Sequence, residues 1–529
     1  MFLQLILDAT NKMREEIRFL LLYTCAGCIV YYLLISHGLF NHYDGLWHPS
    51  RFYAGDWEVS LGRWVWPYID RFRFGLVSAP MNALFSLIMT GLGHCLLFRL
   101  FDVKSVFVRL LTGLLWIGST AFSVSLSYVY MSPTFAAAFL FSIAAVYVLI
   151  RVNTAAGFVS SAFLFALSMG CYQAYSGVSC LILCAYFIVL CSRTEPVTDI
   201  LKYCVKTAGM ILGGGILYLL GTKLHLHLRN IALEEYGGAS SVTAGAIVRN
   251  LPSGIKLCYT EFYKYFATSS RHSNYFKENQ ATLLVFSVLI VIMAVRLFGV
   301  ARKSLLHAVL MSAGAVLLPL AANFVLLLAV DSTYIKIQMS CGMAMMPSVL
   351  LCMTHLTVCG IVQRIPGKKT LIPRTAAALV TISTALLVWF RICSVTNDQL
   401  AMEEGRTSVS AIAQMVTDDL MDEDVIVSGE KSCIIGIPSE NTLFFRNEAW
   451  KQANQFARFG RWSVTAECDF FSWRSTFKYL RGLNLNFCSP GEYGKLKKSE
   501  KVEEMPCYPA QGSIQKIGDI VVVKISDQY

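Results

Sequence analysis

The sequence predicts an all-α polytopic membrane protein with about eleven transmembrane helices and a small extracytoplasmic α/β domain at its C-terminus. Of its 529 residues 55% are hydrophobic and 15% are charged, whereas soluble proteins carry about 25% charged residues. Apolar windows of about 20 residues, the length that crosses a bilayer as a helix, recur up to residue 393. After residue 395 the composition changes to a mixture of polar and apolar residues. These three observations define the two expected parts, 1–395 and 396–529.

The membrane part begins with a charged segment, "NKMREEIR", followed by the first apolar window. No small-residue cleavage site follows this window, so we expect an anchor and not a removed signal peptide. The expected spans are 17–36, 78–98, 106–126, 132–150, 155–175, 177–192, 207–222, 281–298, 305–330, 337–363 and 373–393.

The short loops between these windows predict the orientation, because Lys and Arg concentrate on the cytoplasmic side of a membrane. With a cytoplasmic N-terminus, short outer turns such as "SLSYVYMSP" and "VDSTYIK" carry almost no Lys or Arg, and the basic residues of the other short loops fall inside. They are Arg99, Lys104, Arg109, Arg151, Arg193, Lys202, Lys206, Arg296, Arg302, Lys303, Arg364, Lys368, Lys369 and Arg374. The segments 37–77 and 225–280 and the C-terminal part then lie outside the cell membrane.

The formal net charge of +11 does not require a nucleic-acid partner. Residues 396–529 contain 15 basic and 19 acidic side chains, so the positive excess belongs to the membrane part. Anchoring of the inner face to anionic lipid accounts for that excess. We therefore expect a lipid bilayer and no nucleic acid among the partners.

The C-terminal part, 396–529, is expected to fold as a domain with its own core. "DQLAMEEGRTSVSAIAQMV" has helical periodicity, and "DVIVSG", "SCIIGI" and "GDIVVVKIS" resemble short β-branched strands. The charged run "KLKKSEKVEE" is expected to be a solvated loop. Oxidation could pair the cysteines of this part in three ways, with four free thiols as the alternative. They are Cys433, Cys468, Cys488 and Cys507.

The first outer loop concentrates charges between two spans, in "NHYDGLWHPSRFYAGDWEVSLGRW" and the residues that follow. "GDWEVSLGRW" is typical of a helix start, with Asp56 as N-cap and Glu58 one turn inside. Such a helix would hold carboxylates at the boundary of lipid and water. In the alternative interpretation, Asp56 only caps a helix and the tryptophans only form an aromatic belt. The charged residues of the loop are Asp44, Asp56, Glu58, Asp70, Arg51, Arg63, Arg71 and Arg73.

Two further segments place polar groups near the same face. "GCYQAYSG" contains Tyr172, Gln173 and Tyr175 at the outer end of the fifth span, where they need hydrogen-bond partners. These three side chains form hydrogen bonds either with a ligand or between neighbouring helices. In the segment 225–280, "IKLCYTEFYKYF" is amphipathic, as expected of a helix that lies in the membrane interface with its aromatic side down.

The loop motif "YDG…YAGDWEVSLGRWVWPYI", together with "GCYQAYSG", resembles the glucosyltransferase family of bacterial O-antigen serotype conversion. The layout of the whole chain is similar to the GT-C class of membrane glycosyltransferases. Many members of the family carry two adjacent acids before the tryptophan, and here Gly55 replaces the first. This departure leaves open whether Asp44 or Asp56 is the principal carboxylate.

The resemblance implies transfer of glucose or a similar hexose from a polyprenyl-phosphate donor to a cell-surface glycan or its lipid-linked precursor. The acceptor hydroxyl needs a general base, for which the candidates are Asp44 and Asp56. The departing phosphate needs a cation, for which the first candidate is Arg63. Glu58 would orient the acceptor. Other candidate ligands of phosphate or sugar are Arg71, Arg73, Arg229, Tyr172, Gln173, Tyr175 and Lys336.

Two other functions remain as alternatives. A flippase or exporter of lipid-linked sugars would carry polar residues deep inside several spans, whereas here the charges gather at the outer boundary. A glycan polymerase would lengthen a chain instead of adding a side branch. No cofactor is expected; His42 and His48 near Asp44 suggest a divalent metal as an alternative, but their spacing matches no known metal motif.

Overall fold

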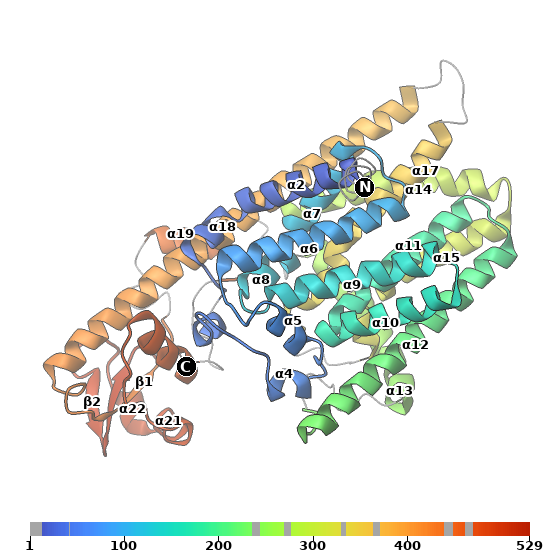
Figure 1. Ribbon diagram of the computed structural model, residues 1–529. Coiled ribbons are helices and arrows are strands. Elements are labelled where there is room, and N and C mark those ends of the chain that lie inside the picture. Colours follow the sequence, from blue (N-terminus) through green and yellow to red (C-terminus); the bar gives the residue numbers. More distant parts are fainter. Residues whose placement is uncertain are drawn as a thin grey trace, which may run out of the picture.

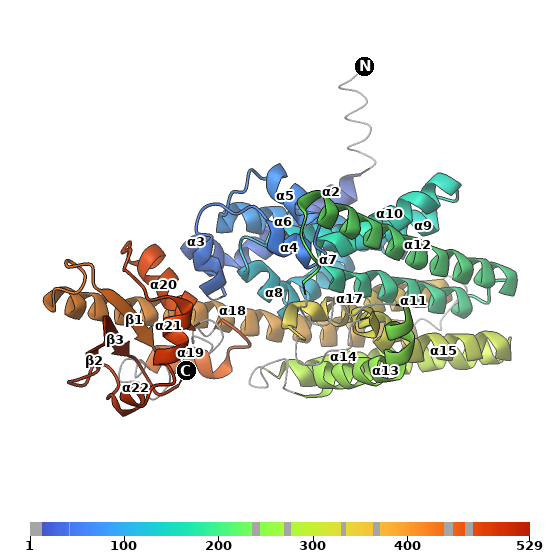
Figure 2. The same ribbon diagram turned by 90° about the horizontal axis from the view of Figure 1, so that it is seen from below.

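The computed structural model describes residues 13–41, 43–234, 244–268, 277–328, 335–362, 371–438, 448–460 and 469–528. It is mostly helical, with a small sheet near the C-terminus (Figure 1). Figure 2 shows the sheet and its helices at one end of the helical bundle, joined to it by the long helix α18. Of the positions interpreted above, His42, Lys368, Lys369, Arg364 and Cys468 lie outside the described residues.

The bundle consists of helices, most of which coincide with the predicted apolar windows, although α12 and α18 extend well beyond theirs and α13 lies in none. They are α2 (Arg14–Val30), α3 (Tyr32–His37), α6 (Ala79–Leu100), α7 (Val106–Ile117), α8 (Thr120–Ser127), α9 (Ser132–Arg151), α10 (Ala155–Cys171), α11 (Ser176–Ser192), α12 (Val197–Arg229), α13 (Ala244–Ala267), α14 (Glu278–Ala301), α15 (Leu305–Ala322), α16 (Phe324–Leu328), α17 (Cys341–Val362) and α18 (Leu371–Asp422). Short turns connect them: η1 (Tyr43–Trp47), α4 (Asp56–Ser60), α5 (Trp66–Phe72), η2 (Gln173–Tyr175) and η5 (Ile337–Ser340).

Hydroxyl side chains fix several of the helix starts. Ser105, Ser119, Thr154 and Ser304 each accept a hydrogen bond from a backbone N–H in the first turn of the helix that follows. These caps satisfy donors that a helix otherwise leaves unpaired, typically contributing about 1 kcal/mol each. The connections between apolar helices are therefore encoded locally.

The apolar helices indicate that the protein associates with a membrane. Within the described ranges, eight helices are long and apolar enough to cross a bilayer, and nine if α7 and α8, bent by 60° at Gly118–Ser119, count as one broken span. The helices α2 and α10 coincide with two further predicted windows, but each has 17 residues. The count of eleven spans and the orientation therefore stay predictions.

The C-terminal part contains the sheet and several short helices. Strand β3 (Ile520–Lys524) lies in the centre, parallel to β1 (Lys431–Ile435) and antiparallel to β2 (Ile514–Ile517). The helical elements are α19 (Glu448–Phe456), α20 (Asp469–Ser475), the π-helical turn η7 (Thr476–Leu480), α21 (Pro490–Leu496) and α22 (Glu500–Glu504). The strands predicted in "SCIIGI" and "GDIVVVKIS" are confirmed.

Two predictions for this part are wrong. "DVIVSG" is a turn and not a strand, because Asp424 and Gly429 adopt positive φ angles and the backbone folds back after α18. "KLKKSEKVEE" is not a loop: it contains the end of α21 and all of α22, whose Val502 is fully buried. Short helices with one buried residue give little periodicity, so the charges dominated the pattern.

A buried charge cluster joins the C-terminal part to the bundle. Arg458 lies 2.7 Å from Asp398 on α18 and 3.3 Å from Glu278 at the start of α14. Arg391 on α18 lies 3.3 Å from Glu278. All four side chains are at most 1% exposed. Because two cations meet two anions, the cluster compensates its own charge.

Helix α13 confirms the amphipathic helix predicted in the segment 225–280. Its aromatic side packs on protein: Tyr265 and Phe266 are buried, and the Phe266 ring lies 4.8 Å from that of Phe286 on α14. Tyr259 and Tyr263 are exposed. The buried side therefore faces neighbouring helices, and the position of α13 in a membrane stays a prediction.

Candidate functional site

The first outer loop folds back on itself and is closed at its base. Phe52 donates its N–H to the carbonyl of Gly75 at 2.8 Å, and Val77 donates to Ser50 at 2.9 Å. Inside this closure, Asp70 accepts two hydrogen bonds from Arg73 at 2.7 and 3.0 Å and one from the Ala54 N–H at 2.8 Å. Burial raises the pKa of Asp70 to about 6, against the opposing effect of Arg73. Arg73 is thus engaged in holding the loop.

The helix predicted after "YAG" exists, but its cap differs from the prediction. Gly55 is the N-cap of α4 and Asp56 is the first helical residue, so the expectation of an Asp56 cap is wrong. Glu58 accepts the N–H of Gly55 at 2.7 Å and so takes the capping role. The Asp56 carboxylate is thereby left to point outward, and its side chain is 66% exposed.

Asp56 contacts a residue 173 positions away. Its Oδ1 lies 2.8 Å from Nη1 of Arg229, the last residue of α12. Figure 1 shows α4 beside this end of α12. A second link follows the helix, where Glu234 donates its backbone N–H to the carbonyl of Ser60 at 3.0 Å. The loop and the end of α12 therefore form one unit that joins two of the predicted site residues.

One face of α12 is polar and faces this loop. Tyr218, Thr222, His225 and Arg229 recur at spacings of three and four residues, which places them on the same side of a helix. Exposed leucines such as Leu224, 54% exposed, lie between them in sequence and occupy other sides. The same periodicity in "YLLGTKLHLHLR" could have revealed Tyr218 and His225, which the sequence interpretation did not single out.

His225 connects this face to the loop. Its Nδ1 lies 2.7 Å from the carbonyl of Gly221, so Nδ1 carries the proton and Nε2 accepts a hydrogen bond from the Tyr68 hydroxyl at 2.9 Å. The imidazole also stacks on Trp64, with ring centroids 5.2 Å apart and planes inclined by 21°. The contacts of His225 with Trp64 and Tyr68 hold the segment after α4 against α12.

Arg63 lies between aromatic rings on this segment. Its guanidinium carbon is 4.9 Å from the Tyr172 ring centroid and 5.9 Å from that of Trp66. Its buried Nε finds no hydrogen-bond acceptor among the described residues. Stacking holds a guanidinium in place without using its N–H groups, so these remain available to an anion.

Gln173 and Gly62 bring three segments together. Gln173 Nε2 donates to the Leu61 carbonyl at 2.7 Å and to the Tyr218 hydroxyl at 2.9 Å. Gly62 has a φ of +78°, and a Cβ there would lie 2.3 Å from the Tyr218 hydroxyl. Only glycine fits this position without a shift. Gln173 therefore links η2, α12 and the loop that carries Arg63.

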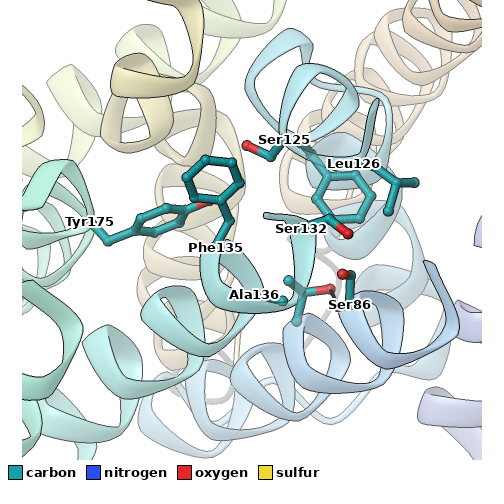
Figure 3. A pocket seen from close by; sticks show the side chains of 9 residues that line it. Ser86, Ser125, Leu126, Ser132, Phe135, Ala136 and Tyr175 are labelled. Atoms are coloured by element: carbon teal, nitrogen blue, oxygen red, sulfur yellow. Dashed lines mark hydrogen bonds between the residues drawn. The ribbon is translucent and has the colours of Figure 1, made fainter. Parts of the chain in front are cut away.

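Tyr175 lies away from the loop, inside the bundle. It lines a cavity of about 10 Å³ between α6, α8, α9 and η2. Figure 3 shows its ring beside Phe135, with Ser86, Ser125 and Ser132 around the same space. Ligand pockets usually measure roughly 300–1,000 Å³. This cavity is smaller than a sugar site. The Tyr175 ring lies 6.3 Å from the ring of Tyr172, so Tyr175 packs against a site residue from inside the bundle.

Three other predicted site residues, Asp44, Arg71 and Lys336, lie on elements other than α4 and α12. Asp44 lies in η1, which packs on α20 and η7 of the C-terminal part, where the rings of Trp47 and Phe471 are 5.2 Å apart. Arg71 is exposed, 6.0 Å from the Tyr68 ring. Lys336 is exposed at the start of η5, which packs on α8 and η2.

The metal alternative stays a prediction, because His42 lies outside the part of the chain that the structure describes. No group of three His, Cys, Asp or Glu side chains converges there. The His48 ring instead packs on Phe52 at 4.2 Å and on Tyr130 at 4.7 Å.

Comparison with known proteins gives a match to a family model. The model described as "Glucosyl transferase GtrII" matches residues 48–353, more than half of the chain. Asp56, Arg63, Gln173 and Arg229 fall inside the matched region, and Asp44 precedes it. Neither a curated protein nor a solved structure matches the chain.

Proposed function

The chain belongs to the glucosyl transferase GtrII family, and on this premise we propose that it transfers glucose or a similar hexose from a polyprenyl-phosphate donor. The acceptor is a cell-surface glycan or its lipid-linked precursor, at the outer face of the membrane. The family implies the glucosyltransferase activity; the donor, the acceptor and the residues below are our proposal.

The observation that carries the proposal is the contact of Asp56 with Arg229, together with Arg63, which stacks on Tyr172 in the segment that directly follows α4. It pairs an accessible carboxylate with one guanidinium group at the end of α12, and a second guanidinium group follows seven residues along the same loop. A carboxylate can remove a proton from a sugar hydroxyl, and guanidinium groups bind phosphate oxygens well. The transfer of a sugar from a lipid phosphate needs both.

In the proposed reaction, Asp56 accepts the proton of the acceptor hydroxyl as that oxygen attacks the anomeric carbon. The bond between this carbon and the phosphate oxygen breaks, and its electron pair leaves with the polyprenyl phosphate. Arg63 stabilises the charge that develops on the phosphate. Its buried Nε supports this role, because an unpaired buried donor costs about 1–3 kcal/mol and a phosphate oxygen would remove that penalty.

Arg229 has a positioning role in this scheme. Its contact with Oδ1 fixes the Asp56 carboxylate and leaves Oδ2 to the acceptor. Gln173 and Tyr218 hold the segment with Arg63 in register with α12. Glu58 supports α4 through its cap and so orients Asp56.

The apolar side of α12 suits the lipid part of the donor. Leu220, Leu224 and Leu228 are 58%, 54% and 70% exposed, all within about three helical turns of Arg229. An isoprenoid chain could lie along these side chains in the bilayer while its sugar phosphate meets the polar face. We propose on this basis a GT-C type arrangement, with residues 1–395 as the transmembrane catalytic part and 396–529 outside.

Asp44 remains the second candidate for the base. Its turn, η1, lies against the C-terminal part, so we propose that this part closes over the site and contacts the acceptor. The buried charges Glu278, Arg391, Asp398 and Arg458 do not favour a transporter, since they pair with one another instead of lining a path.

The test measures transfer of labelled glucose from polyprenyl-phosphate glucose in membranes that contain the full chain. Asp56→Asn should lower the rate by roughly 10²–10⁴-fold, the usual contribution of a general base, with unchanged protein abundance. Asp199→Asn is the matched control, because Asp199 is also an exposed aspartate in an ion pair, with Lys202 at 3.1 Å. If Asp56→Asn keeps full activity and Asp44→Asn loses it, Asp44 is the base; full activity of both removes them from the mechanism.

A metal requirement is tested in the same assay. We propose that arginine side chains alone stabilise the departing phosphate, so addition of EDTA should leave the transfer rate unchanged. Loss of activity with EDTA that returns with Mg²⁺ or Mn²⁺ would assign the phosphate to a metal instead.

A further inference from the structure

Two cysteines of the C-terminal part lie side by side, Cys433 on β1 and Cys488 on an extended segment that is bridged to β1. Ser432 on β1 donates its N–H to Asn486 at 2.8 Å and accepts the N–H of Cys488 at 2.9 Å. These bonds form a parallel bridge between Ser432 and Phe487. In a parallel pair the register advances equally on both strands, so Cys433 is the neighbour of Cys488.

The two thiols also point to the same side of the sheet. Cys433 and Cys488 are 0% and 2% exposed and belong to one buried cluster with Ile435 and Val522. Neighbouring strands lie about 4.8 Å apart. This separation falls within the roughly 4.4–6.8 Å between Cα atoms that a disulfide bridges.

The thiols interact directly. A hydrogen bond with the Cys433 side chain lowers the pKa of Cys488, and the nearby Lys431 acts in the same direction. A lowered pKa increases the fraction of thiolate, which is the nucleophile in thiol–disulfide exchange. Cys488 is therefore suited to begin the exchange, with Cys433 as the resolving thiol.

We propose that Cys433 and Cys488 form a disulfide in the mature protein. The Cys488 thiolate attacks the disulfide of a thiol–disulfide oxidoreductase outside the membrane and forms a mixed disulfide. The Cys433 thiolate then attacks the Cys488 sulfur and releases the enzyme in its dithiol form. Two thiols of the chain lose two electrons and two protons, and the oxidoreductase disulfide gains them.

The structure favours this pair over the others that the sequence allows. The Cys507 thiol donates instead to the Asp527 carboxylate at 3.5 Å, near the end of the chain. Cys468 lies outside the described residues. The bond would close residues 434–487 into a loop that contains Arg458 and Phe471, the residues that contact the bundle and η1. It would thus fasten the segment through which the C-terminal part docks.

The test uses the full chain in native membranes and needs neither donor nor acceptor. Free thiols are blocked with N-ethylmaleimide, the protein is digested without reductant, and the peptides are identified by mass spectrometry. We expect a linked pair that contains Cys433 and Cys488 and that separates on reduction. Reduction should also lower the melting temperature of wild-type protein, but not that of the double variant Cys433→Ala, Cys488→Ala.

A maleimide–polyethylene glycol gel shift gives an independent count. Reduction should expose two additional thiols in the wild type and in the control Cys507→Ser, and none in the double variant. Direct alkylation of Cys433 and Cys488 without reductant would overturn the proposal, as would a peptide that links either one to Cys468 or Cys507. Since no transfer is measured, these outcomes leave the proposed function untouched.

Discussion

Replacing Gly62 with alanine tests how strictly α12 positions the arginine of the proposed site. Gly62 precedes Arg63 and has a φ of +78°, and a Cβ there would lie 2.3 Å from the Tyr218 hydroxyl and 3.1 Å from Gln173 Nε2. Two separate penalties follow. The left-handed conformation costs an L-residue about 1–2 kcal/mol, and forcing a methyl group into packed surroundings costs about 1–3 kcal/mol.

The penalties differ in what relieves them. In Gly62→Ala with Tyr218→Phe, the hydroxyl is gone and the nearest remaining atom of that side chain, Cζ, lies 3.4 Å from the Cβ position. Most of the steric part should then disappear, because only the contact with Gln173 Nε2 at 3.1 Å stays tight, while the conformational part remains. Tyr218→Phe alone should cost about 1 kcal/mol, because it loses the hydrogen bond from Gln173.

The assay is a double-mutant cycle on the four proteins in detergent, with unfolding followed by heat or denaturant and glucose transfer measured beside it. Gly62→Ala should lose roughly 2–5 kcal/mol of stability and, if Arg63 shifts by about 1 Å, roughly 10²-fold in rate. The double variant should be more active than Gly62→Ala. A wild-type rate and stability in Gly62→Ala, or additive effects without any rescue, would refute the reasoning.

Three further predictions concern the supports of the site. Burial raises the pKa of Asp70 to about 6, above its unfolded value of 3.8, so the native state binds the proton more tightly than the unfolded state. The free energy of unfolding should therefore fall by about 3 kcal/mol as the pH rises from 4 through 6. A similar dependence on pH in Asp70→Asn would contradict this explanation. Arg458→Leu should destabilise the protein by about 3–5 kcal/mol, since it leaves the buried Asp398 without its cation; a melting temperature equal to that of the wild type would show that the pair contributes nothing net. Trp47→Ala should loosen the C-terminal part and speed its proteolysis, because the contact with Phe471 is lost; unchanged proteolysis would place the docking elsewhere.

Much of the helical part could be predicted, because each apolar window is a local pattern. The bounds of α6, α9 and α14 agree with the windows to within about three residues. The bend between α7 and α8 was missed, since "WIGSTAF" reads as a continuous apolar run although Ser119 caps the second helix. Hydropathy alone does not distinguish a helix from two helices with a cap between them.

The sequence predicts individual residues of the site but not which of them lie together. Asp56, Arg63, Gln173 and Arg229 were chosen from separate segments, and their meeting depends on how α12 returns to the first loop. The roles of some were not visible: Arg73 binds Asp70, and Glu58 caps α4. The sequence alone does not distinguish a carboxylate or an arginine that holds a loop from one that binds a substrate.

The buried charge cluster was missed for the same reason. Glu278, Arg391, Asp398 and Arg458 come from three distant segments, and each one alone looks like an ordinary residue near the end of a helix. Pairing between segments far apart in sequence has no periodic signature. Only the tertiary structure reveals that these charges compensate one another away from water.

Helix α18 continues without interruption for 52 residues, from the last predicted span to the sheet. At about 1.5 Å per residue it is a rod of roughly 78 Å, more than twice the thickness of a bilayer's hydrocarbon core. In the predicted orientation one end lies in lipid through its apolar side chains, and the other carries β1 after a tight turn. The tilt of this rod therefore sets how high the C-terminal part stands above the bilayer. Because Arg458 and Phe471 also dock this part on the bundle and on η1, a thinner or thicker membrane would tilt the bundle and the C-terminal part together.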